Sequence, residues 1–274
     1  PRPQSVIVNG SNRASDALRQ EIDASPLLKL AEKAAIRVEV QDGRFVFVLD
    51  DRPLGSVRFA GFRPDRKARE ALEHLAGYLN VRALTNPNTR LGDALTVSLK
   101  RLAQPATKDK PGQADDLLVE DGTAVIPNGR NLAIDVTNKA AVPLHIYVLD
   151  LDQDIRLAPL HPPSGFGKPL KPGETLQIGY GPDVVITLSV PKGQDRTEDH
   201  LVVLGSVGTI DPAELILPAL GEKYTPLRDL FGSGSRLDRD LRAALTGQVP
   251  DAATALDPKD DWTAVHRTVV VRRA

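Results

Sequence analysis

Short segments in which apolar and polar residues alternate recur through the second half of this chain, and turn signals separate them. Six such segments lie at residues 132–136, 144–149, 155–160, 175–178, 184–190 and 201–204. Pro162-Pro163, Lys171-Pro172-Gly173 and Pro191-Lys192-Gly193 stand between them. A period of two with frequent turns is typical of antiparallel strands that bury one face. The pattern predicts an all-β, antiparallel, sandwich-like domain, which a last strand at 262–271 rejoins.

The first part of the chain mixes strand and helix patterns. Residues 36–40 alternate strictly, Asp42-Gly43 supplies a turn, and alternation resumes at 45–49, which predicts a hairpin. Apolar residues between 68 and 79 fall on one helical stripe after Pro64. Ser15 and Ser25 are expected to cap two short helices, the second over 27–35, and a strand at 95–99 ends this α+β part.

The composition of two segments predicts the domain organisation. Residues 104–117 are polar and contain two Pro and one Gly, so they are read as a linker between an α+β accessory domain, 1–103, and the β domain, 118–274. Residues 208–259 change character, with helical patterns at 214–220 and 237–245 around Gly232-Ser233-Gly234-Ser235. They are expected to form a flexible, partly helical insertion.

Composition also excludes several classes of function. The 274 residues contain no Cys, which excludes disulfides, thiolate metal sites and a cysteine nucleophile in this chain. With 35 Lys and Arg against 36 Asp and Glu, nothing favours nucleic acid as a partner. No apolar run reaches the roughly 20 residues of a membrane helix, so no membrane span is expected and the cytoplasm is the default compartment. The absence of Met leads us to expect further sequence before Pro1.

Few residues fit the pattern of a catalytic or metal site. Asp150, Asp152 and Asp154 begin like a calcium loop, but Ile155 and His161 stand where that loop needs Gly and Glu, so a hairpin turn is preferred. The five histidines lack the spacing of a zinc motif, and the glycines before Lys168 lack that of a phosphate-binding loop. No catalytic residue, metal ligand or cofactor is predicted.

The order of several short motifs resembles a known family. The motifs lie at 131–138, 143–151, 155–161, 170–174, 190–193 and 260–262. The second reads PLHIYVLDL, a Pro follows the third, and the fourth reads LKPGE. A further similar stretch, at 74–87, precedes them. From about Ile36 onward the chain resembles the non-catalytic C-terminal region of bacterial caspase-like (peptidase C14, metacaspase-like) proteins. The 208–259 insertion departs from that pattern.

The resemblance implies a role without chemistry of its own. Caspase-like peptidases use a Cys nucleophile, and since this chain has none, no catalytic residue carries over. The chain is expected to serve an upstream caspase-like protease domain or another protein partner in scaffolding, recognition or regulation. Alternatives are an adhesion-like β-sandwich binding module of a surface protein and a hydrolase that uses His161 or His200.

Loops between the strands are the predicted contact surface, because strands present loops at low entropic cost. The residues expected to form it are Asp150, Asp152, Asp154, His161, Phe166, Lys168, Lys192 and Asp195.

Overall fold

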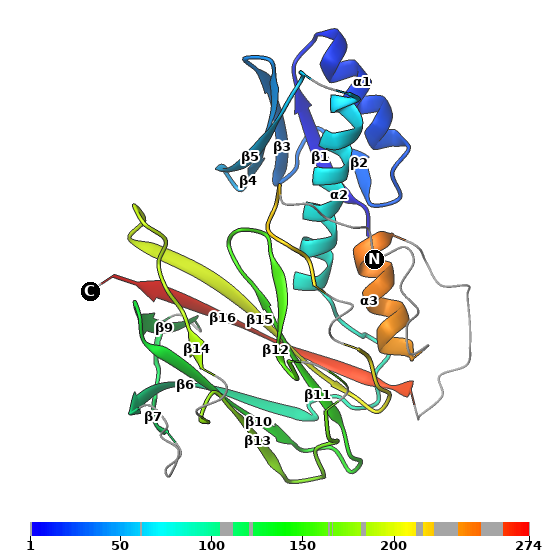
Figure 1. Ribbon diagram of the computed structural model, residues 1–274. Coiled ribbons are helices and arrows are strands. Elements are labelled where there is room, and N and C mark those ends of the chain that lie inside the picture. The colour runs from blue at the N-terminus through cyan, green and yellow to red at the C-terminus, as the bar shows by residue number, and fades with distance from the viewer. Residues whose placement is uncertain are drawn as a thin grey trace.

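The fold is mainly β. The computed structural model describes residues 2–60, 62–104, 112–120, 123–163, 165, 167–181, 185–211, 216–221, 235–247 and 260–273. In these residues three helices, α1 to α3, accompany strands β1 to β16, which form three sheets (Figure 1). No helix in the described ranges is long and apolar enough to cross a membrane.

The first sheet belongs to the N-terminal part. Its order is β2 (Leu28–Leu30), β1 (Gln4–Asn9), β3 (Ile36–Gln41), β4 (Arg44–Leu49) and β5 (Arg52–Arg58). Strand β1 runs parallel to β2 and β3, and the other pairs are antiparallel. The predicted hairpin is β3–β4, and Asp42 and Gly43 both have positive φ, 48° and 68°, as a tight hairpin turn requires.

Two helices accompany this sheet, and their apolar stripes enter its core. In α1 (Arg13–Asp23), Leu18 and Ile22 are fully buried. The side chain that caps α1 is that of Asn12, and Ser15 bonds back to it from the third helical position, so the prediction of Ser15 as the cap is wrong by three residues. Helix α2 (Pro64–Arg82) buries the predicted stripe and begins at a proline, whose missing N–H costs a first turn nothing.

Two predicted helices are absent from the described residues. Instead of a helix over 27–35, the chain forms the edge strand β2, which is held to β1 by Gln4 N–H to Leu27 O and Ala31 N–H to Val6 O. In 214–220, residues 216–220 are described and are not helical, because Leu217 bridges to Leu157. In both places pairing with a neighbouring strand overrides local propensity.

The second part contains two sheets. One has the order β13 (Thr175–Ile178), β10 (Asn131–Asn138), β6 (Leu95–Gln104), β7 (Gln113–Asp116), with β14 (Ile186–Thr187) also on β10. The other has the order β12 (Leu157–His161), β11 (His145–Leu151), β15 (Arg196–Ser206), β16 (Trp262–Arg272), β9 (Thr123–Pro127), β8 (Leu118–Glu120). The pairing is antiparallel except between β9 and β16, which are parallel, so the expectation of a purely antiparallel arrangement is wrong at that pair.

Strand β6 crosses the predicted division of the chain. The alternation at 95–99 does form a strand, but residues 95–101 of that strand pair with β10. Strand β7 comes from 104–117 and pairs with β6, while 105–111 lie outside the described residues. The domain boundary at 104–117 therefore stays a prediction, but the strand before it shares a sheet with strands after it.

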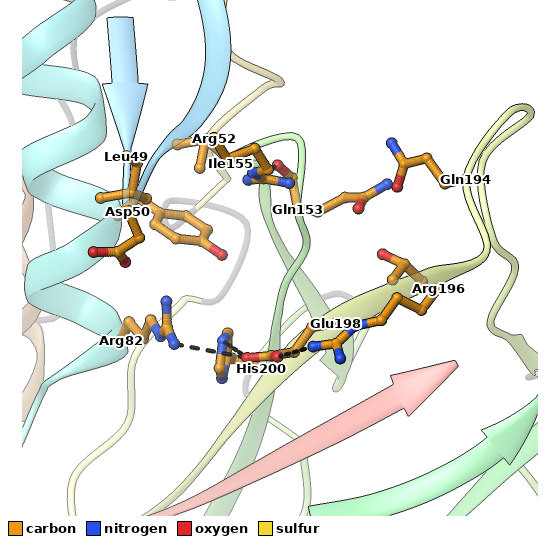
Figure 2. A pocket seen from close by; sticks show the side chains of 12 residues that line it. Leu49, Asp50, Arg52, Arg82, Gln153, Ile155, Gln194, Arg196, Glu198 and His200 are labelled. Carbon is orange, nitrogen blue, oxygen red and sulfur yellow. Dashed lines mark hydrogen bonds and ion pairs between the residues drawn. The ribbon is translucent and has the colours of Figure 1, made fainter. Parts of the chain in front are cut away.

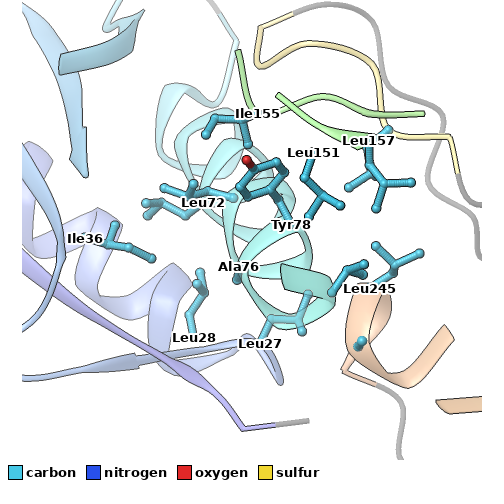
Figure 3. Packing of buried hydrophobic residues seen from close by; sticks show 14 of the residues in the cluster. Leu27, Leu28, Ile36, Leu72, Ala76, Tyr78, Leu151, Ile155, Leu157 and Leu245 are labelled. Carbon is cyan, nitrogen blue, oxygen red and sulfur yellow. The ribbon is translucent and has the colours of Figure 1, made fainter. Parts of the chain in front are cut away.

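Two apolar clusters hold these parts together. One cluster contains residues of two sheets: the sheet of β6 and β10, and the sheet of β11, β15 and β16. The second joins α1, α2 and the first sheet to the opposite faces of β11 and β15 and to α3 (Arg236–Thr246) (Figure 3). Helix α3 confirms the helix predicted at 237–245 and packs against α2, while most of 208–259, including 222–234 and 248–259, lies outside the described residues.

Candidate functional site

A cleft of about 610 Å³ lies where the N-terminal part meets the first residues of β15 (Figure 2). Four separate segments line it: the β4–β5 turn, the C-terminal half of α2, the β11–β12 turn, and the start of β15 with the turn before it. The lining residues are Leu49, Asp50, Arg52, Tyr78, Arg82, Gln153, Ile155, Gln194, Arg196, Thr197, Glu198 and His200. The volume falls in the range of about 300–1,000 Å³ that is common for ligand sites.

The β11–β12 turn that forms one wall is fixed to α2. The Asp152 carboxylate accepts hydrogen bonds from the N–H groups of Asp154 and Arg156 and pairs with the Arg156 guanidinium at 2.8 Å, so it closes the turn on itself. Tyr78 OH donates to Asp152 O at 2.8 Å. The Ile155 side chain is 1% exposed and inserts into the core beside α2 (Figure 3). This wall is therefore preformed.

Glu198 is the central anion of the cleft. Its Oε1 atom lies 3.0 Å from His200 Nε2 and 3.9 Å from Arg82, and its Oε2 atom lies 3.7 Å from Arg196 (Figure 2). The two distances to arginine exceed those of charge-assisted hydrogen bonds, which are about 2.7–2.9 Å. Glu198 thus offsets the charge of both guanidinium groups without saturating their donors.

His200 is held neutral and engaged on both ring nitrogens. Its Nδ1 atom lies 3.1 Å from Thr268 Oγ1, and Nε2 faces Glu198. Burial and the nearby positive charge of Arg82 lower the pKa of His200 to about 4, although Glu198 acts in the opposite direction. Since both nitrogens already contact protein groups, this ring is poorly placed to act as a free general base.

A second group of carboxylates lies behind the cleft, on the opposite face of β11 and β15. Asp150 pairs in register with Leu201, so Asp199 is its diagonal neighbour on the same face. Burial, and then the charge of Asp199, raise the pKa of Asp150 to about 7; burial, and then the charge of Asp152, raise that of Asp199 to about 6. The Asp150 Oδ1 atom is buried without a hydrogen-bond partner among the described residues.

The structure brings together only some of the residues predicted as the contact surface. Asp150, Asp152 and Asp154 lie on the end of β11 and in the turn after it, and Lys192 and Asp195 lie in the turn before β15. Gln153 and Gln194, from these same two turns, line one cleft.

The third predicted loop leads elsewhere. His161 pairs with Val148 in the middle of β11, and beyond it Leu170 bridges to Leu144 at the other end of that strand. Lys168 is exposed on this path, and Phe166 lies outside the described residues. Burial lowers the pKa of His161.

Two groups of cleft residues were not predicted from the sequence: Arg52, Tyr78 and Arg82, and Arg196 and Glu198. More than a hundred residues separate the first group from the second, so no local pattern connects them. The alternation that predicts this strand begins at Leu201, because the first five residues of β15, RTEDH, carry no apolar side chain. Extending that alternation upstream is the one signal that would have placed Glu198 and His200 on one face.

Neither a cluster of metal ligands in the described residues nor a similar known protein points to a particular chemistry. Within the described ranges, no three His, Asp or Glu side chains are close enough to hold a metal ion. In the comparisons with known proteins, no family model, curated protein or solved structure matches this chain.

Proposed function

We propose that this chain is a non-catalytic binding module and that the cleft between its N-terminal part and β15 holds a segment of a protein partner. The observation that carries the proposal is the cleft itself: a preformed cavity of about 610 Å³ whose polar groups come from four segments. Its one imidazole is neutral and engaged on both nitrogens, which favours binding over acid–base catalysis.

In this proposal the β-rich part is a sandwich-like scaffold. The apolar cluster shared by the sheets of β10 and β11 supports that arrangement, since aligned sheets bury their inner faces against each other. The scaffold presents the turns at 152–155 and 191–195 to the partner, while the first sheet and α2 form the opposite wall.

The motif order described above suggests where such a module works. We propose that it is the C-terminal portion of a bacterial caspase-like cysteine peptidase and that it positions or regulates the protease domain or recognises its substrate. A complete gene that encodes this chain without a His and Cys pair upstream would contradict this assignment and leave the binding proposal standing.

Selection from a random peptide library displayed on phage tests the binding role. Peptides enriched on the purified chain should lose at least about tenfold in affinity when the exposed cleft residue Gln194 is changed to Trp, which fills the cavity. Gln113→Trp, at an exposed position on β7, is the matched control and should leave the affinity unchanged. No enriched peptide, or equal loss in both variants, would contradict a binding role for the cleft.

A further inference from the structure

At its start, β15 pairs with another strand of the described residues on one edge only. Pairing with β16 begins at Arg196, whereas pairing with β11 begins only at His200, opposite Leu151. After Leu151 the chain turns away through Asp152 to Ile155. Along 196–199, β15 therefore has one edge that no described strand covers, and the cleft lies beside this edge.

The alternation of hydrogen bonds in an antiparallel pair shows which main-chain groups face that edge. Arg273 N–H donates to Asp195 O, so Asp195 belongs to a hydrogen-bonded pair with β16. Residues alternate in direction along a strand, so Thr197 and Asp199 also point to β16. The N–H and C=O groups of Arg196 and Glu198 consequently point away from β16, toward the uncovered edge.

Two of the arginines beside this edge retain unused donor capacity. Arg82 and Arg196 have side chains that are 37% and 64% exposed, and to the described residues they make only the long contacts with Glu198 given above. Arg52, on the opposite wall, uses one N–H for Gln153 O at 2.7 Å. Guanidinium groups bind carboxylates through paired, short hydrogen bonds that Glu198 does not supply here.

We propose that the cleft binds an extended, acidic peptide segment, which adds as a strand to β15 through the main chain of Arg196 and Glu198 and places a carboxylate between Arg82 and Arg196. Strand addition supplies affinity through the main chain and selectivity through side chains. The inference rests on the binding role proposed above and specifies its ligand. Three arginines against Asp50 and Glu198 in the lining give the charge complementarity that selects an acidic segment.

The test compares two labelled peptides by fluorescence anisotropy with the purified chain. Both are nine residues long and alternate Val and Thr, except that the fifth, central residue is Glu in one and Gln in the other. The Glu peptide should bind at least about tenfold more tightly, with an advantage that shrinks as salt is raised. Arg82→Gln and Arg196→Gln should each abolish most of this preference. Arg58→Gln, at an exposed position at the far end of β5, should preserve it.

N-methylation of the Glu peptide tests strand addition separately. In one variant of the Glu peptide the amides of the odd-numbered residues are methylated, and in a second variant those of the even-numbered residues. One variant should lose binding and the other should bind almost as before, because only one edge of the peptide faces β15. If both methylated peptides lose affinity equally, or if neither loses affinity, strand addition is wrong. Equal affinity for Glu and Gln peptides would overturn the acidic preference.

These results can be distinguished from failure of the binding role itself. Phage-selected peptides could carry no net charge, lose affinity in the Gln194→Trp variant and tolerate N-methylation. In that case the cleft is a binding site, but its ligand is not an acidic segment that adds as a strand.

Discussion

Asp150 and Asp199 are the residues for which the structure predicts the clearest dependence on pH. Both carboxyls have a pKa raised in the folded chain, to about 7 and about 6, whereas in the unfolded chain they titrate near 3.8. The folded state therefore binds more protons between about pH 4 and pH 7. These two groups contribute most to stability below about pH 4, and that contribution is lost progressively as the pH rises from about 4 through the folded pKa values of about 6 and 7.

Replacing either carboxyl by an amide should stabilise the chain at pH 8. A pKa difference of one unit corresponds to about 1.4 kcal/mol, so Asp199→Asn is expected to raise the free energy of unfolding by roughly 1–3 kcal/mol at pH 8 and by much less at pH 4. Urea denaturation at both pH values measures this. The exposed Asp93→Asn serves as the control, and an equal effect of Asp199→Asn at the two pH values would show that the pKa of Asp199 is not raised in the folded chain.

Tyr78 shows what a single hydroxyl contributes to the cleft wall. Its OH is the link from α2 to Asp152 O, and removing one partner of a largely buried hydrogen bond costs about 1–2 kcal/mol. Tyr78→Phe should lower the free energy of unfolding by that amount and speed the amide exchange of Asp154 and Arg156 in the turn. Unchanged exchange there would show that the turn does not depend on this hydrogen bond, since His74 of α2 also contacts Ile155 O at 3.0 Å.

Helix α2 is the element that connects the two parts of the chain, and at Gly77 it lies close to the backbone of α3. A Cβ atom at Gly77 would lie 3.1 Å from the carbonyl oxygen of Leu245 and 3.4 Å from its Cα. Substituting Ala for Gly inside a helix normally gains about 1 kcal/mol. Here the backbone of α3 must move to accept the methyl group.

Gly77→Ala is therefore expected to gain nothing or to lose stability, and to make α3 more accessible to proteolysis. Urea denaturation and limited trypsin digestion measure the two effects, with cleavage expected at Arg239 and Arg242. A gain of about 1 kcal/mol, with α3 as resistant as before, would contradict the packing of α3 on α2.

The elements that sequence predicted correctly are those in which local pattern and tertiary pairing agree. The β3–β4 hairpin, α2 and most strands of the second part follow their periodicity. Errors occur where a neighbour decides the conformation: β2 is a strand because β1 is beside it, and Leu217 is extended because Leu157 pairs with it. The cleft was not predictable for the same reason, since its four segments meet only through tertiary packing.

At the scale of the whole molecule, one apolar cluster extends from the first sheet to β11, β15 and Trp262. Trp262 is the sole tryptophan of the chain, and its Nε1–H donates to Asp240 of α3 at 2.7 Å. A core shared in this way couples the unfolding of the two parts. Tryptophan fluorescence and far-ultraviolet circular dichroism should therefore give coincident urea transitions, and two separated transitions would show that the parts unfold independently.

Amide exchange measured by NMR shows whether the edge of β15 at 196–199 is open and whether a peptide covers it. In the free chain the N–H groups of Arg196 and Glu198 should exchange rapidly, while those of Thr197 and Asp199, which face β16, should be protected. Saturation with the Glu peptide should slow exchange at Arg196 and Glu198 and leave the other two unchanged. Protection of the Arg196 and Glu198 N–H groups before the peptide is added, or no change after it, would show that no peptide strand adds to this edge.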